Sequence, residues 1–99
     1  MDLKDCKKMG YHMHYEGESA DPMLFVKIEA VNALPKWTWW VSEYDEKTGD
    51  CYGIAKGLEL EAGYFNIREI FQTPGLIVLQ DKNYAPETFS QLLNREKNN

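Results

Sequence analysis

The stretch Trp37–Lys56 reads WTWWVSEYDEKTGDCYGIAK, and it decides the fold of this chain. Its first eight residues are mostly aromatic or β-branched, which is typical of a β-strand. Thr48-Gly49-Asp50 is a turn signal, and Cys51–Lys56 then returns with strand-forming residues. We therefore predict an antiparallel hairpin over residues 37–56.

Three further segments have the patterns of strands. Residues 23–31 alternate, so that one face of a strand would carry Leu24, Val26, Ile28 and Ala30. A hairpin connection over residues 32–36 joins this strand to the next one. Residues 58–61 alternate again and predict a strand or an extended loop. Residues 76–79 are a continuous apolar run, which indicates a short buried strand.

Two helices are expected in the second half of the chain. Asn66 is a suitable N-cap for a short helix near residues 66–72. Pro86 suits the first turn of a C-terminal helix near residues 86–95, whose apolar stripe would be Phe89, Leu92 and Leu93. The fold class is therefore α+β, with an antiparallel sheet of about four or five strands and two helices packed on it.

Length and charge limit the domain organisation and the function classes. The chain has 99 residues, which form one domain over 1–99 with a variable N-terminal segment at 1–20 and a frayed tail at 94–99. The net charge of −5 argues against direct nucleic-acid binding, which needs clustered basic charge. No apolar run approaches the length that spans a membrane, so we expect a cytoplasmic protein with no membrane partner.

The tryptophans are the most informative group in the sequence. In an ideal strand Trp37, Trp39, Val41 and Glu43 share one face, and Thr38, Trp40, Ser42 and Tyr44 share the other. Large aromatic residues on both faces indicate either that both faces of the sheet are covered, or that a tryptophan is exposed and anchors a partner. At Tyr64-Phe65 we expect Phe65 in the core and Tyr64 at the rim.

Acidic residues gather directly after the tryptophans. Between Glu43 and Glu69 seven acidic residues stand against three basic ones. Their role is either a solvated face, an acidic docking surface, or a carboxylate pair at Glu59 and Glu61 that does acid–base work or holds a divalent cation. As an acidic docking surface, the candidate partner-binding residues are Trp37, Trp39, Trp40, Glu43, Asp45, Glu59, Glu61 and Tyr64.

The remaining chemistry-bearing residues give no diagnostic motif. His12 and His14 share a face of a predicted strand over residues 11–15 and could ligate zinc with two further ligands, or could be ordinary surface histidines. Cys6 and Cys51 read as free thiols in a reducing compartment, pairing only if the fold brings them together. The sequence has no glycine-rich phosphate loop and no nucleophile elbow, and we predict no catalytic residues, no cofactor and no enzyme activity.

Several segments within residues 21–93 resemble a family of small domains of unknown function that occur largely on plasmids, phages and other mobile elements. The segments that carry the resemblance are Asp21-Pro22, residues 37–45, 52–57, 59–70 and 75–81, and the closing helix near Leu92. The N-terminal segment around His12 departs from the family. The resemblance implies a mobile-element context, and it supplies no activity, because the family has none to transfer.

These observations together predict a non-enzymatic binding or inhibitor protein of a mobile element. Its acidic, aromatic surface would occupy a basic site on a host defence protein, such as the nucleic-acid-binding site of a CRISPR or restriction complex. The alternatives are a small-ligand or divalent-metal module near Glu59, Glu61 and Tyr64, and a structural accessory subunit that assembles through an edge strand.

Overall fold

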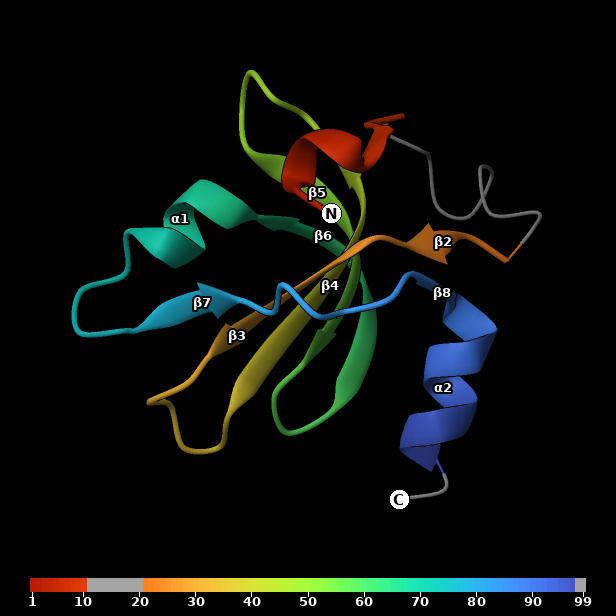
Figure 1. Cartoon of the computed structure of the whole chain (residues 1–99). Helices are drawn as coiled ribbons and strands as arrows, with labels where there is room; N and C mark the ends of the chain where they lie inside the picture. Colours follow the sequence, from red (N-terminus) through yellow and green to blue (C-terminus); the bar gives the residue numbers. More distant parts are fainter. Residues whose placement is uncertain (11–20, 98–99) are drawn as a thin grey trace.

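A computed structural model describes residues 1–10 and 21–97 of the chain, and the fold is α+β, as predicted. The main sheet has six strands, and five of them follow the order β6-β5-β4-β3-β7 with antiparallel neighbours (Figure 1). These five strands are β3 (Val26–Ala30), β4 (Trp37–Tyr44), β5 (Asp50–Lys56), β6 (Leu60–Asn66) and β7 (Val78–Gln80). The hairpin predicted from residues 37–56 is confirmed as β4 and β5.

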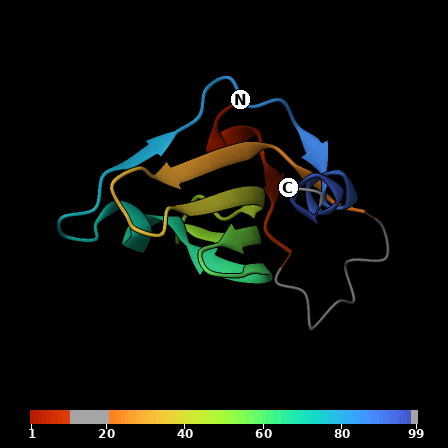
Figure 2. The ribbon, with the colours of Figure 1, turned by 90° about the horizontal axis from the view of Figure 1, so that it is seen from below.

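Short strands, a 3₁₀ turn and two helices surround the five antiparallel strands. The 3₁₀ turn η1 (Leu3–Asp5) leads into β1 (Lys7–Lys8), which pairs in parallel with the end of β4. The strands β2 (Met23–Leu24) and β8 (Glu87–Thr88) form a separate two-stranded sheet. The helix α1 (Ile67–Phe71) follows β6, and α2 (Phe89–Lys97) ends the described chain on the other side of the sheet (Figures 1 and 2).

Each face of the sheet has its own apolar core. The core beneath α1 contains Val26, Ile28, Ala30, Trp39, Val41, Cys51 and Ile67. The core beneath α2 contains Leu24, Trp40, Ile54 and Leu92. Trp39 and Trp40 are neighbours in sequence but belong to different cores, at 8% and 3% exposure. For these two residues the interpretation that both faces are covered is confirmed.

A β-bulge corrects the predicted alternation along β4. The register of β4 with β5 shifts between Val41 and Glu43, so Glu43 lies opposite Tyr52 while Tyr44 lies opposite Cys51. Tyr44 therefore packs on the core of Trp39, although simple alternation places it with Trp40. Gly53 faces the bulge, and a Cβ atom there would lie 1.9 Å from the carbonyl oxygen of Trp40. The bulged backbone occupies the space that any other side chain needs.

Three predicted strand segments differ in detail. Residues 23–31 do not form one strand, because the chain breaks at Phe25 and Leu24 joins the core beneath α2 instead of the face of Val26. The strand expected near residues 58–61 is β6, which continues through Asn66 because it pairs with the whole of β5. The apolar run at residues 76–79 is not a buried strand, because β7 is an edge strand, and Leu79 within it and Ile77 just before it are more than half exposed.

The C-terminal helix begins later and ends later than expected. The helix α1 has the predicted bounds, and the Asn66 side chain caps it by accepting from the Glu69 N–H at 3.0 Å. In contrast, Glu87 belongs to β8, and α2 begins at Phe89. Thr88 and Gln91 form a reciprocal capping box, in which each backbone N–H donates to the other side chain. The helix continues to Lys97, so residues 94–97 are not a frayed tail.

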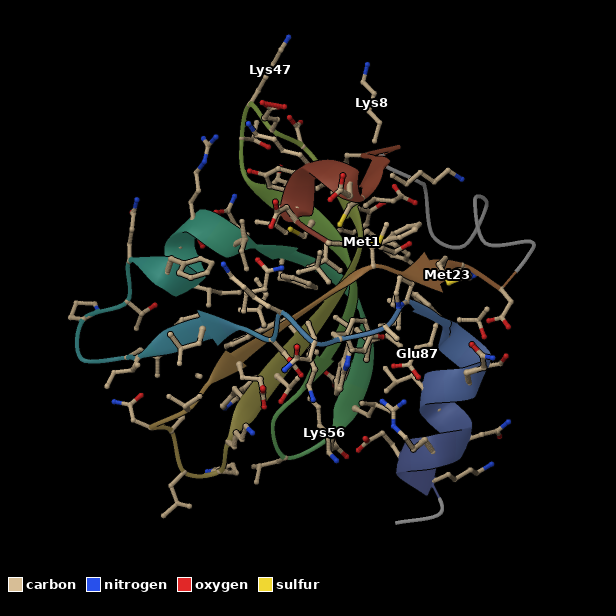
Figure 3. All side chains as sticks on the ribbon, viewed as in Figure 1. Met1, Lys8, Met23, Lys47, Lys56 and Glu87 are labelled. Atoms are coloured by element: carbon tan, nitrogen blue, oxygen red, sulfur yellow. The ribbon has the colours of Figure 1, made fainter. Side chains whose placement is uncertain are left out.

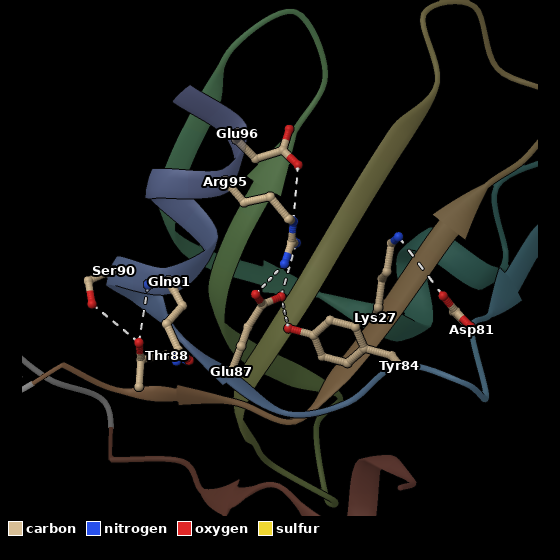
Figure 4. Close-up of polar contacts among 9 residues, drawn as sticks. All are labelled: Lys27, Asp81, Tyr84, Glu87, Thr88, Ser90, Gln91, Arg95 and Glu96. Atoms are coloured by element: carbon tan, nitrogen blue, oxygen red, sulfur yellow. Dashed lines mark hydrogen bonds and ion pairs between the residues drawn. The ribbon is translucent and has the colours of Figure 1, made fainter. Parts of the chain in front are cut away.

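A polar network fastens α2 to the rest of the fold (Figure 4). Glu87 is only 9% exposed, and it accepts hydrogen bonds from the Tyr84 hydroxyl at 2.5 Å and from both terminal nitrogens of Arg95. Burial, followed by the bond to Glu87, raises the pKa of the Tyr84 hydroxyl. Lys56 on β5 forms a further ion pair with Glu96 on α2. Glu87 is therefore a buried carboxylate that is paired with Arg95.

The two cysteines are free thiols that share the core beneath α1. Cys51 is fully buried, and Cys6 packs against the same core. Burial raises the pKa of each thiol from 9.0 to about 12, with smaller contributions from Asp5 on Cys6 and from Cys6 on Cys51. Both thiols are therefore protonated in the folded protein over the neutral pH range.

This burial makes the fold sensitive to alkaline pH. In the unfolded chain the thiols ionise near their ordinary pKa, whereas the folded chain keeps both protons until much higher pH. The free energy of unfolding is therefore expected to fall as the pH rises from about 9 towards about 12. Urea unfolding at about pH 8 and about pH 10.5 measures the loss. The Cys6→Ala/Cys51→Ala variant should lose less stability over the same interval, and an equal loss in both proteins would contradict the assignment.

Candidate functional site

The predicted partner-binding residues do not form one surface. Trp39, Trp40 and Glu43 are 8%, 3% and 5% exposed. Glu43 accepts a hydrogen bond from the Gly10 N–H at 2.8 Å, which ties it to the N-terminal segment. Three of the eight predicted residues are therefore parts of the interior and offer a partner almost no contact area.

The other candidates lie at different places along the sheet. Asp45 follows the end of β4, eight strand residues and roughly 25 Å from Trp37. Its carboxylate accepts from the Lys47 N–H at 2.9 Å and shapes the β4–β5 turn. Tyr64 is 46% exposed and lies opposite Tyr52, on the face of the sheet that α2 covers. Tyr64 is thus at the rim, as expected, but away from Trp37.

Trp37, Glu59 and Glu61 do gather at one end of the sheet. Trp37 begins β4, Glu59 lies in the β5–β6 turn and Glu61 follows in β6, so all three are close to the same two hairpin loops (Figure 1). The tips of these loops carry Leu34 at 99% and Leu58 at 87% exposure. We call this set the Trp37 surface; its residues are Leu34, Trp37, Leu58, Glu59 and Glu61.

Trp37 is exposed but held in place. Its side chain is 41% exposed, and its ring stacks on Trp39 with centroids 5.9 Å apart and an interplanar angle of 23°. Gly57 packs against the same ring, since a Cβ atom at Gly57 would lie 2.3 Å from it. The absence of a side chain at residue 57 therefore makes room for the indole. A tryptophan that is already fixed loses little conformational entropy when a partner covers it.

The Trp37 surface has uncompensated negative charge. Lys36 and Lys56, which border it, are paired with Glu29 and Glu96. In the described part of the chain, neither Glu59 nor Glu61 forms an ion pair. Both carboxylates are exposed. The surface therefore combines a rigid indole, two exposed leucines and two free carboxylates.

Leu34 and Leu58 were not identified from the sequence. Large aliphatic residues at the tips of hairpin loops are unusual, because turns are normally built from polar residues and glycine. Once Asn32–Lys36 and Gly57–Glu59 are recognised as turns, the leucine in each is the signal that could have found them. The signal can be recognised only once the ends of the hairpins are known, and the turn that contains Leu58 is defined by the start of β6 at Leu60.

The remaining predictions concern metal ligands, the two histidines and membrane spans. Among residues 1–10 and 21–97, no three His, Cys, Asp or Glu side chains converge as metal ligands would. His12 and His14, with the strand predicted around them, lie outside the described residues. In the same two described ranges, no helix has the length and apolar character that crossing a membrane requires.

Comparison with known proteins does not extend the resemblance noted above. No protein-family model, no curated protein and no solved structure matches the chain.

Proposed function

We propose that this chain is a non-enzymatic binding protein of a mobile genetic element, which inhibits a host defence protein through the Trp37 surface. The observation that carries the proposal is that Trp37 is half exposed yet fixed by Trp39 and Gly57. Tryptophan is enriched among the residues that dominate binding energy, particularly where the side chain is preorganised. The flanking leucines add apolar area that no other described element covers.

The charge of the surface favours a basic partner. Glu59 and Glu61 present two carboxylates that form no ion pair with a described residue, and the whole chain has a net charge of −5. Opposite charge on a partner steers association and disfavours acidic competitors. A nucleic-acid-binding site on a CRISPR or restriction complex has the required basic character, and the mobile-element resemblance makes such a host protein the proposed target.

Variants of the Trp37 surface test the proposal. Tagged chain is used to capture partners from a bacterial lysate that contains restriction and CRISPR complexes, and mass spectrometry compares the proteins recovered. For a captured complex, Trp37→Ala should weaken binding by roughly 30-fold, which corresponds to a hot spot of about 2 kcal/mol. Leu58→Ser should also weaken binding, and because Leu58 is 87% exposed its replacement leaves the fold intact.

Charge reversal at the Trp37 surface tests the electrostatic part of the proposal, and charge reversal elsewhere is its matched control. The Glu59→Lys/Glu61→Lys variant should weaken binding and reduce its sensitivity to salt. The Glu46→Lys/Glu69→Lys variant makes the same charge change at exposed residues away from the Trp37 surface, and it should bind as the parent protein does. Equal binding by all variants would reject this surface. A captured complex whose DNA or RNA binding is unaffected by the chain would reject the inhibitory role.

A further inference from the structure

A second feature lies at the opposite end of β4, away from the Trp37 surface. A hollow of about 710 Å³ opens between the N-terminal segment and the β4–β5 turn. Its lining residues are Leu3, Lys4, Cys6, Lys8, Met9, Tyr44, Asp45, Glu46 and Lys47. The volume lies within the range of small-molecule sites in proteins, roughly 300–1,000 Å³.

The N-terminal wall of the hollow is fastened to the sheet. The strand β1 pairs in parallel with the end of β4, where Lys7 is opposite Glu43 and Lys8 is opposite Tyr44. The Met9 N–H continues this pairing to the Tyr44 carbonyl at 3.3 Å. At the start of the wall, the Asp2 N–H donates to the Asp5 carboxylate at 2.7 Å and closes the 3₁₀ turn.

The opposite wall, the β4–β5 turn, is held by Arg68 of α1. The guanidinium donates to the carbonyl oxygens of Glu46 at 2.6 Å and Lys47 at 2.7 Å. Gly49 has φ of +85°, and a Cβ atom there would lie 2.7 Å from the Arg68 side chain. Glycine is thus required both by the turn conformation and by the path of Arg68. Both walls of the hollow are therefore fixed by bonds that do not involve a ligand.

The chemistry of the lining separates into an apolar part and a charged part. Leu3, Cys6, Met9 and Tyr44 are buried or half-buried and supply apolar contact area. Lys4, Lys8 and Lys47 are exposed, and none forms an ion pair with a described residue. Figure 3 shows Lys8 and Lys47 extending from this same end of the molecule. The Asp45 and Glu46 carboxylates also line the hollow, so three ammonium groups stand beside two carboxylates there.

We infer that this hollow binds a small amphipathic anion, a molecule with an aromatic or aliphatic body and one anionic group. The body occupies the apolar lining, and the anionic group lies near the lysines at the rim. The three lysines outnumber the two carboxylates of the lining and form no ion pair with a described residue, although the whole chain has a net charge of −5. Opposite charge and a preformed apolar cavity are the two features that such ligands need. The site is independent of the proposed partner-binding role.

Two fluorescent probes with one shared skeleton test the inference. Anilinonaphthalene sulfonate carries the anionic group, and N-phenylnaphthylamine lacks it. We expect the full chain to bind the sulfonate saturably and at least about tenfold more tightly than the neutral probe, with the difference reduced by salt. The Lys8→Gln/Lys47→Gln variant should bind the sulfonate about tenfold more weakly and the neutral probe unchanged.

Controls separate this hollow from other apolar surfaces. The Lys36→Gln/Lys82→Gln variant removes the same charge from exposed lysines that do not line the hollow, and its binding should equal that of the parent chain. In amide NMR spectra the sulfonate should shift the signals of Lys8, Tyr44 and Lys47 and leave those of Trp37 and Leu58 in place. Equal affinity of both lysine variants, or shifts confined to the Trp37 surface, would overturn the inference.

Discussion

Replacing Gly53 with alanine is expected to destabilise the fold by about 3 kcal/mol or more, which lowers the melting temperature by roughly 12–24 °C. The added Cβ atom would lie 1.9 Å from the Trp40 carbonyl oxygen and 3.0 Å from the carbonyl carbon. These are backbone atoms, so no side chain can rotate away to relieve the clash. Either the bulge in β4 straightens or the β4–β5 pairing separates, and both changes disturb the two cores at once.

Thermal and urea unfolding measure this loss. Ala62→Val serves as the control, because Ala62 is exposed on the neighbouring edge strand β6 and valine suits a strand. The control should change stability by no more than about 0.5 kcal/mol. If Gly53→Ala were as stable as the parent chain, the bulge opposite Gly53 would not be a fixed feature of the fold.

The local elements of this fold follow from the sequence. The β4–β5 hairpin is set by the aromatic and β-branched run from Trp37 and by the turn at Thr48-Gly49-Asp50. The bounds of α1 follow from the Asn66 cap, which needs only the residues beside it. In both cases the determining interactions join residues that are near in sequence, so the pattern alone contains them.

The bulge and the C-terminal elements depend on distant partners. Simple alternation places Tyr44 with Trp40, and only the pairing of β4 with β5 shows that the bulge moves it to the other core. Gly53 within an otherwise strand-forming segment was the available signal, since glycine in a strand often marks a bulge. The strand β8 forms because Glu87 lies opposite Leu24 in the two-stranded sheet and its carboxylate forms an ion pair with Arg95. These contacts override the helix start that Pro86 suggests.

The candidate site could be predicted only in part for the same reason. The sequence named Trp37, Glu59 and Glu61 among eight candidates, yet it did not separate Trp37 from its buried neighbours Trp39 and Trp40. Burial of Trp40 depends on α2, which lies about 50 residues further along the chain. The hollow was not predicted at all, because it requires the parallel pairing of β1 with the end of β4, a contact between segments with no connecting motif.

Leu92→Ala is expected to cost about 3 kcal/mol, within the 2–5 kcal/mol range of buried leucine truncations. Leu92 is fully buried in the core beneath α2, together with Leu24, Trp40 and Ile54. Leu92 thus packs against both β2 and the main sheet, and its truncation leaves a cavity beside the Trp40 indole. A loss of this size is a large fraction of the stability of a small domain, about 5–15 kcal/mol.

Leu93→Ala is the matched control, because Leu93 is the adjacent residue on α2 and is 44% exposed. The predicted apolar stripe treated Leu92 and Leu93 alike, whereas the structure gives them different surroundings. Alanine has a high helix propensity, so Leu93→Ala should cost less than about 1 kcal/mol. Urea unfolding of both variants gives the comparison directly. Similar losses would mean that α2 does not cover this face as described. A large loss at Leu92 alone is the result expected if α2 docks on the core of Trp40 through Leu92.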